Sequence, residues 1–262
     1  MFYPWFRHLI AAQPEFRFDR YLDNVSVWID PKNQIELKFV CGVYDRRIQN
    51  IIKRFVRSGD NCLDVGANVG GVALALAKQV GPTGQVHCFE PGPPFAERLR
   101  RNLEINPNLA RRVSVHEVGL SNEAGTLRWS QDPEHPWNGG FVPRDVILDL
   151  PVKTLDEFVR ENRIDRVDFI KIDTEGMELE VLVGGRDTLL SHRPVLVLET
   201  LMFFDGELKL RKQLQEFLTS VGYSLFTLTG ATPRRVSYPS LPSNSLALHR
   251  AHLSAGAGVL QR

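Results

Sequence analysis

The sequence predicts a doubly wound α/β domain that binds a nucleoside, and two stretches carry this prediction. The first is Asn61 to Gly71, where a short apolar strand runs through a glycine-containing turn into an apolar helix. Such a unit aims backbone N–H groups and the positive end of a helix at a ligand. The second is Gln85 to Glu90, an apolar strand whose final acid lies 20 positions after Gly70. This is the spacing of a ribose-binding carboxylate, so Glu90 is expected to hold a ribose.

The middle of the glycine turn distinguishes two classes of cofactor. A dinucleotide site has glycine where this chain has Asn68, because the backbone must approach a pyrophosphate there. S-adenosylmethionine has no phosphate, and a short Asn that tolerates left-handed backbone can occupy this position. Two interpretations without a ligand remain open, namely a plain tight turn at Asn68 and a helix cap at Glu90.

Composition narrows the class of protein and its partners. The 262 residues, 43% hydrophobic and 24% charged, are ordinary for one large α/β domain. With 32 Lys and Arg against 31 Asp and Glu, the net charge of +1 offers no field for a polyanion, so nucleic acid is not expected as a partner. The three cysteines lack metal-type spacing, and no apolar run reaches the roughly 18 residues of a membrane span. A cytoplasmic protein with reduced cysteines is therefore predicted.

The N-terminal region begins with an aromatic arm. Pro4 and Pro14 prevent a long helix in the first 22 residues. The arm is interpreted as a cover for an acceptor pocket, a homo-oligomer contact or a lipid contact, with packing on the domain's own surface as the alternative. Residues 25–29 and 34–40 alternate around the turn Asp30-Pro31-Lys32-Asn33, which predicts a β-hairpin, and a helix through Arg57 follows.

The rest of the chain is predicted to form further strands of an open sheet and the helices that connect them. Strands are expected over residues 113–118, 126–130, 146–152, 167–172, 194–200, 223–229 and 245–250. The last two can form a closing pair with one antiparallel strand. We expect residues 1–57 to pack on a core of residues 58–250, with a flexible tail over residues 251–262.

Three blocks of the sequence together resemble the FkbM-type methyltransferases. They are Asp64 to Gly70 (DVGANVG), Phe89 to Pro91 (FEP) and Lys171 to Glu178 (KIDTEGME). The resemblance covers roughly residues 25–250. It implies the class I (Rossmann-like) methyltransferase fold, an α/β architecture whose seven-stranded, mostly parallel sheet contains one antiparallel strand, plus an N-terminal hairpin and helix. It also implies an S-adenosylmethionine-dependent O-methyltransferase, without naming the acceptor.

Cofactor contacts are expected from the glycine turn, from the second strand and from the end of the third strand. The candidates are Asp64, Gly66, Ala67, Asn68, Gly70, Glu90, Pro91, Val118, Gly119 and Leu120.

The candidate catalytic residues gather around the end of the strand over residues 167–172. Lys171 and Asp173 share one face because side chains alternate along a strand, and open α/β sheets bind ligands at this edge. Acids at a helix start are also favoured by the helix dipole, yet a lysine in an apolar strand needs a partner. Methyl transfer to an alcohol needs orientation and a base, for which Asp173, Glu175 and His135 are candidates. An acid cluster can also hold Mg²⁺ or Ca²⁺, but Lys171 speaks against it, so no metal is predicted.

The polar insert over residues 131–144 is expected to form a wall or lid of the acceptor pocket. Trp137 and Asn138 within it, together with Glu178, are the candidate acceptor contacts. An ordinary surface hairpin whose Trp137 covers a gap in the core is the competing interpretation.

Three classes of function follow from these observations. The favoured one is an O-methyltransferase acting on a hydroxyl of a small natural product, sugar or glycan. A NAD-type Rossmann oxidoreductase is the second, and Asn68 with the closing strand pair argues against it. A nonenzymatic nucleoside-binding module is the third, and the Lys171–Asp173 cluster argues against that.

Overall fold

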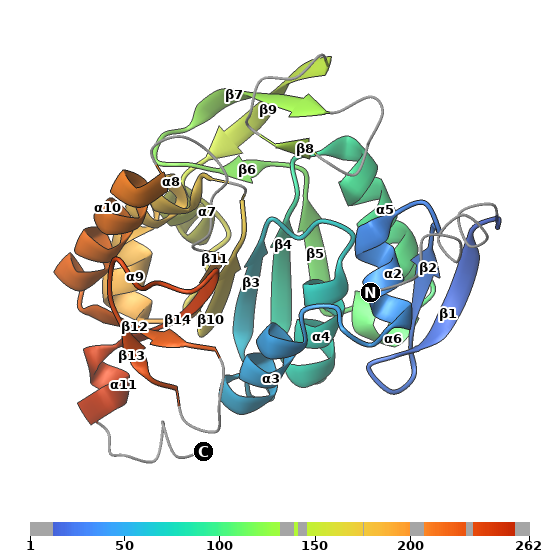
Figure 1. The fold of residues 1–262 in the computed structure, drawn as a ribbon, viewed down its shortest axis with the longest axis horizontal. Helices are drawn as coiled ribbons and strands as arrows, with labels where there is room; N and C mark the ends of the chain where they lie inside the picture. The colour runs from blue at the N-terminus through green and yellow to red at the C-terminus, as the bar shows by residue number, and fades with distance from the viewer. Residues whose placement is uncertain are drawn as a thin grey trace.

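The computed structural model describes residues 13–131, 139–140, 146–174, 176–199, 207–228 and 233–254 (Figure 1). The strands are β1 (Phe16–Tyr21), β2 (Val25–Ile29), β3 (Asn61–Val65), β4 (Gln85–Phe89), β5 (Val113–His116), β6 (Gly119–Leu120), β7 (Gly125–Gln131), β8 (Gly139–Gly140), β9 (Val146–Lys153), β10 (Phe169–Ile172), β11 (Val195–Glu199), β12 (Tyr223–Thr227), β13 (Arg235–Val236) and β14 (Asn244–His249). The helices are α2 (Gln34–Val40), α3 (Arg46–Phe55), α4 (Gly71–Gln79), α5 (Pro93–Glu104), α6 (Pro107–Ala110), α7 (Leu155–Glu161), α8 (Glu178–Gly184), α9 (Arg186–His192), α10 (Glu207–Ser220) and α11 (Arg250–Ser254).

The central sheet has the strand order β13-β12-β14-β11-β10-β3-β4-β5. Strands β5, β4, β3, β10 and β11 pair in parallel, and β14 runs antiparallel between β11 and β12. The mostly parallel α/β sheet is therefore confirmed. The predicted strand count of seven differs from the eight that the described residues form, because β13 adds a second antiparallel strand at the edge. With two residues, β13 is too short to produce a periodic sequence signal.

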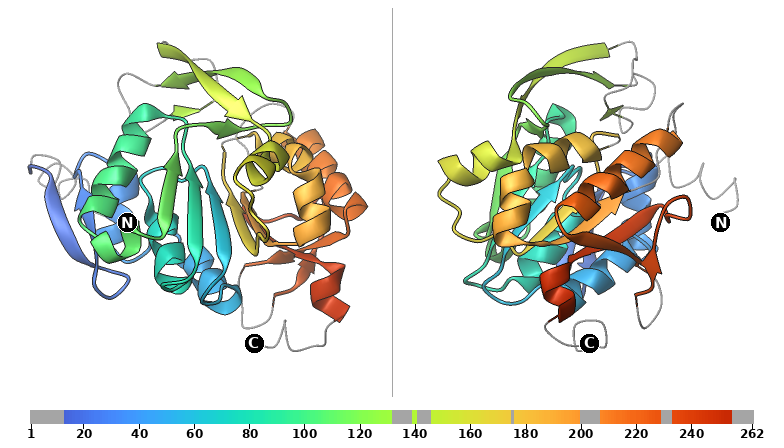
Figure 2. Two further views of the ribbon diagram at one scale, coloured as in Figure 1. Left: turned by 180° about the vertical axis from the view of Figure 1, so that it is seen from behind. Right: turned by 90° about the vertical axis from the view of Figure 1, so that its left-hand side faces the viewer.

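Helices cover both faces of this sheet, as the side view in Figure 2 shows. On one face, alternate strand residues such as Cys62 and Phe169 pack with α3, α4 and α5. On the other face, their neighbours Leu63 and Ile170 pack with α7, α8, α9 and α10. Because both faces are buried, the strands read as continuous apolar runs, and their polar residues gather at the strand ends.

The N-terminal hairpin is formed by different segments from those predicted. Strands β1 and β2 pair antiparallel, with Phe16 opposite Ile29. The predicted second strand, residues 34–40, is helix α2 instead. The physical reason is Asn33, whose carboxamide oxygen accepts hydrogen bonds from the backbone N–H groups of Ile35 and Glu36 and so caps a helix N-terminus.

A second sheet lies beside the carboxyl ends of the parallel strands, in the order β6-β9-β7-β8 (Figure 1). Strand β6 follows β5 after two residues, so this sheet begins at the edge where ligands bind in open α/β folds. Trp129 of β7 is buried against Phe95 of α5, with ring centroids 6.1 Å apart. The second sheet therefore forms a wall next to the end of β4.

Two further features concern the chain ends and membranes. Residues 251–254, where the predicted tail begins, belong to α11, and His252 Nε2 lies 2.7 Å from the carbonyl oxygen of Arg193. Residues 255–262 of that predicted tail lie outside the described part of the chain. Within the described part of the chain, no helix is both long and apolar enough to cross a membrane.

Candidate active site

The turn after β3 brings backbone from three strands into close approach. Gly66 has φ 77°, and its N–H donates to the Phe89 carbonyl at 3.0 Å. A Cβ at Gly66 would lie 1.8 Å from the carbonyl oxygen of Asp173. Only glycine satisfies both the left-handed backbone and this approach, so the turn locks the end of β3 against the segment that follows β10.

Asn68 adopts the left-handed conformation expected at the middle of this turn. Its φ is 49°, and its side-chain oxygen accepts the Val69 N–H at 2.8 Å. Gly70, with φ 89°, is the N-cap residue of α4 and provides no side-chain cap. The apolar helix α4 therefore begins directly at the turn, with its N-terminus at the sheet edge where β3 ends.

Glu90 ends β4 beside the same turn, and its carboxylate is fixed by backbone. The Asn68 N–H donates to Oε2 at 2.8 Å and the Gly92 N–H to Oε1 at 2.9 Å. Burial raises the pKa of Glu90 to about 7, while these two hydrogen bonds act in the opposite direction. Gly92 is the N-cap residue of helix α5, so Glu90 also holds the start of that helix, and this contact is compatible with ribose binding by its free lone pairs. The remaining lone pairs can accept two further hydrogen bonds, as a ribose diol requires.

Lys171 is buried among acids at the end of β10. It lies directly opposite Asp64 in the β3–β10 pairing. Its Nζ donates to the Gly66 carbonyl at 2.9 Å and lies 3.2 Å from Asp173 Oδ2 and 3.6 Å from Asp64 Oδ1. Burial alone would lower the pKa of Lys171, but the Asp173, Asp64 and Asp45 carboxylates outweigh it and raise that pKa. The ammonium of Lys171 therefore stays charged. It links the glycine turn to the carboxylates of Asp64 and Asp173.

The two acids around Lys171 differ in their access to solvent. Asp64 is 0% exposed, and burial raises its pKa to about 6 in spite of Lys171. The Asp173 side chain is 32% exposed, and Lys171 lowers its pKa against the opposing effect of burial. Asp173 is therefore the ionised acid that a bound molecule can reach, whereas Asp64 lies behind it.

Two acids near Asp173 were not among the predicted site residues. Glu199, the last residue of β11, is hydrogen-bonded to Asp173, and this hydrogen bond helps to lower the pKa of Asp173. Asp45 precedes α3 with φ 40°, and burial raises its pKa while Lys171 lowers it. The position of Glu199 at the end of the apolar run PVLVLE was a signal that could have identified it. The sequence around Asp45 indicated only the start of a helix and did not identify Asp45 as a site residue.

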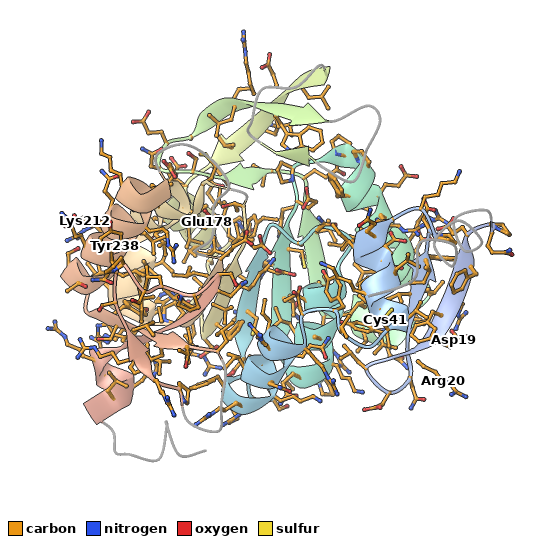
Figure 3. The ribbon with its side chains drawn as sticks, viewed as in Figure 1. Asp19, Arg20, Cys41, Glu178, Lys212 and Tyr238 are labelled. Atoms are coloured by element: carbon orange, nitrogen blue, oxygen red, sulfur yellow. The ribbon has the colours of Figure 1, made fainter. Side chains whose placement is uncertain are left out.

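Glu178, labelled in Figure 3, is the first residue of α8 and holds the loop that follows β10. It is 1% exposed, and its Oε1 accepts hydrogen bonds from the backbone N–H of Thr174 at 2.8 Å and of Gly176 at 3.3 Å, and from the Thr174 hydroxyl at 3.0 Å. These contacts hold the loop against the start of α8. Direct contact between Glu178 and an acceptor stays a prediction.

The remaining cofactor candidates lie at β6, the first strand of the second sheet along the chain, and at the residue before it. A Cβ at Gly119 would lie 3.7 Å from Pro91, so β6 runs beside the end of β4. Val118 is half-buried, and Leu120, 3% exposed, packs in the core below the sheet. Cofactor contacts of Val118, Gly119 and Leu120 stay predictions.

Several predicted residues lie outside the part of the chain that the structure describes. They are Glu175, His135, Trp137 and Asn138. Among the described residues, no three His, Cys, Asp or Glu side chains are grouped so as to hold a metal ion.

The site residues present fit S-adenosylmethionine. Glu90 is a buried carboxylate with spare lone pairs at the position where the sequence predicts a ribose contact, and Asn68 stands where a pyrophosphate site would need glycine. Gly66 lets the turn approach the Asp173 backbone closely, so that the Asp173 carboxylate presents a negative charge beside the turn. The strand order, with antiparallel β14 between β11 and β12, together with this site defines a class I methyltransferase fold.

Comparison with known proteins identifies the family within this class. The methyltransferase FkbM domain matches residues 64–225, so the chain belongs to this family, which confirms the resemblance seen in the sequence. Methyltransferase sdnD of Sordaria araneosa is 31% identical over 154 residues, 47% of this chain and 59% of that protein. The 2-O-methyltransferase NoeI of Sinorhizobium fredii is 28% identical over 207 residues, 70% of this chain and 79% of that protein.

A solved structure agrees with the fold. The crystal structure of methyltransferase FkbM from Methylobacillus flagellatus aligns with a TM-score of 0.51 and 24% identity. The alignment covers 75% of this chain and 44% of that one, so the chain spans less than half of that larger protein.

Proposed function

We propose that this protein transfers the methyl group of S-adenosylmethionine to a hydroxyl of a sugar, glycan or small natural product. The observation that carries the proposal is the pairing of Glu90 with Asp173 across the glycine turn. The first is a buried carboxylate with free lone pairs, and the second is a half-exposed carboxylate kept ionised by Lys171. One fits a ribose and the other a hydroxyl that must lose its proton.

Each residue has a proposed part in the reaction. S-adenosylmethionine, when bound, supplies a methyl group on a positively charged sulfur. Glu90 accepts hydrogen bonds from the ribose hydroxyls, while Gly66, Ala67 and Asn68 shape the turn against which the cofactor lies. Asp173 orients the acceptor hydroxyl and takes its proton, and Glu199 holds the Asp173 carboxylate through a hydrogen bond. Lys171 balances the acids by its charge, which supports a mechanism without a metal ion.

The class of acceptor rests on the family and on one relative. The relative named 2-O-methyltransferase NoeI carries the oxygen position of its product in its name. Hydroxyl methylation by this chain is the corresponding proposal. The insert with His135, Trp137 and Asn138 is proposed to line the acceptor side, with His135 as an alternative base. Loss of Trp137 should then weaken acceptor binding and leave cofactor affinity unchanged.

The organisation of the chain supports two further parts of this proposal. We propose that residues 1–57 belong with a catalytic core of residues 58–250, and the described part of the N-terminal region supports this, because Ile29 and Phe39 belong to the same apolar cluster as Leu74 of α4. Cys41, Cys62 and Cys88 are free thiols, in keeping with a cytoplasmic location. Oligomer formation through the N-terminal arm stays a prediction.

An assay of product formation tests the function directly. The protein is incubated with S-adenosylmethionine and a panel of sugars and hydroxylated natural products, and released S-adenosylhomocysteine is quantified by mass spectrometry. We expect acceptor-dependent release that Asp173→Asn abolishes and that Asp187→Asn, an exposed acid on α9, leaves unchanged. Equal release by the Asp173→Asn variant would remove Asp173 from the mechanism.

A further inference from the structure

A cavity of about 350 Å³ opens next to the candidate active site, between the α2–α3 corner and the ends of β12 and β14. It is lined by Lys38, Val43, Asp45, Arg46, Arg47, Ile48, Leu228, Pro242 and Asn244. Its volume lies in the range of small-molecule sites. We call it the cationic pocket.

Charge is distributed unevenly in the cationic pocket. Lys38, Arg46 and Arg47 contribute three positive charges against the single carboxylate of Asp45. The three basic side chains are exposed, and in the described part of the chain none of them forms an ion pair. The Asp45 carboxylate in turn interacts electrostatically with Lys171. The guanidinium groups are therefore available to a ligand, and they suit carboxylate or phosphate.

The cationic pocket lies close to the acids of the candidate active site, because Asp45 and Asn244 line it. Asp45 interacts electrostatically with both Lys171 and Asp173, and Lys38 acts on Asp173 as well. From the other side, Asn244 lies opposite Glu199 in the β11–β14 pairing. The pocket therefore adjoins, through Asn244 and Asp45, the Asp173–Glu199 pair where the acceptor hydroxyl is expected.

The rest of the lining suits a compact hydroxylated molecule. Leu228, Pro242 and Ile48 supply apolar surface, and the Asn244 carboxamide supplies both a donor and an acceptor. We propose that the cationic pocket binds the anionic group of the methyl acceptor, so that the acceptor is an acidic sugar or a similar hydroxylated molecule carrying a carboxylate or phosphate. This inference rests on the proposed function, because it names the class of substrate for the same site.

One other source of an anion has to be separated from the acceptor, namely the carboxylate of the cofactor's own methionine part. The two sources predict different effects of the same substitutions. If the pocket holds the acceptor, Arg46→Gln combined with Arg47→Gln changes the affinity for acidic sugars and leaves that for S-adenosylhomocysteine unchanged. If it holds the cofactor, the affinity for S-adenosylhomocysteine falls.

Calorimetric titration of matched sugars tests the inference. The protein is saturated with S-adenosylhomocysteine and titrated with methyl glucuronide against methyl glucoside, methyl galacturonide against methyl galactoside, and glucose 6-phosphate against glucose. We expect at least one acidic member to bind about tenfold more tightly than its neutral partner, since several cations act together. The preference should fall to about twofold in the Arg46→Gln, Arg47→Gln variant and shrink as sodium chloride rises from about 0.05 to 0.5 M.

The control is Lys53→Gln, which removes an exposed charge from the far end of the same helix and should leave the preference intact. Equal affinity within all three pairs would overturn the inference while leaving the proposed function standing. Weaker binding of S-adenosylhomocysteine by the arginine variant would overturn it in favour of the cofactor's carboxylate. A wild-type protein that binds no S-adenosylhomocysteine would overturn the proposed function, and the inference with it.

Discussion

Lowering the pH from 8 to 6 should weaken the binding of S-adenosylhomocysteine about tenfold, because Glu90 becomes protonated. The pKa of Glu90 is raised to about 7, chiefly by burial. A group with this pKa is about nine-tenths ionised at pH 8 and about one-tenth ionised at pH 6. If only the carboxylate holds both ribose hydroxyls, the apparent affinity follows the ionised fraction. Asp64, with a pKa of about 6, adds at most about a further twofold in this range.

As the pH falls from 8 to 6, the ligand-free protein should become more stable, although its binding of S-adenosylhomocysteine weakens. The pKa of Glu90 in the folded protein lies above the ordinary value of 4.5, so its contribution to stability is fully present below pH 4.5 and is lost as the pH rises through 7. The loss is on the order of 3 kcal/mol. Rising pH therefore destabilises the empty site and strengthens ligand binding, because the ligand's hydroxyls satisfy the buried charge.

Isothermal titration calorimetry at several pH values measures this effect, with Glu90→Gln as the matched variant. The variant should bind about a hundredfold more weakly at pH 8, since hydrogen bonds to a charged group contribute about 1.5–3 kcal/mol each. Its affinity should vary by no more than about twofold between pH 6 and 8. A wild-type affinity that is independent of pH, or a variant that binds as tightly as wild type, would remove Glu90 from the cofactor site.

Three further substitutions probe the rest of the site. Lys171→Met should lower the free energy of unfolding by about 3–5 kcal/mol in urea denaturation, and by more at pH 8 than at pH 5, because Asp64 and Asp173 lose their counter-charge. Gly66→Ala should abolish binding of S-adenosylhomocysteine by calorimetry, because the new methyl group would meet the Asp173 carbonyl. Glu199→Gln should lower turnover about tenfold in the methyl-transfer assay and leave cofactor affinity unchanged, since Glu199 acts only through its hydrogen bond to Asp173.

The chain supplies controls for these experiments. Gly42 also has a positive φ, of 64°, but a Cβ there would meet nothing within 4 Å. Gly42→Ala should therefore cost about 1 kcal/mol of stability and leave cofactor binding intact. If Gly66→Ala behaves like Gly42→Ala, the close approach at the turn is not essential. A Lys171→Met variant as stable as wild type, or a Glu199→Gln variant with full turnover, would contradict the charge balance described for this site.

The features predicted best from sequence are those set by local chemistry. The turn from β3 to α4 needs glycine at position 66 and a residue tolerant of left-handed backbone at position 68, and both conformations are observed. The acid at the end of β4 follows from spacing alone. The hairpin was assigned to the wrong segments because alternation over residues 34–40 competed with the cap at Asn33, which proved stronger.

The features that sequence could not predict depend on contacts between distant segments. Asp45 joins the site only because α3 packs beside α4, and Glu199 meets Asp173 only because β10 and β11 are neighbours in register. Lys171 was recognised as needing a partner, but its bond to the Gly66 carbonyl links residues 105 positions apart. Pairing at that separation is set by the topology of the sheet, which local patterns do not encode.

A comparison of ligands by thermal unfolding tests the central claim most directly. The protein is heated alone, with S-adenosylhomocysteine and with NAD, each at about a hundred times a micromolar dissociation constant. Binding at that ratio stabilises a protein by about 2.7 kcal/mol, which raises the melting temperature of a chain of this size by roughly 5–10 °C. We predict this rise with S-adenosylhomocysteine, its absence with NAD, and its loss in Glu90→Ala. A rise with NAD and none with S-adenosylhomocysteine would contradict the proposed methyltransferase function.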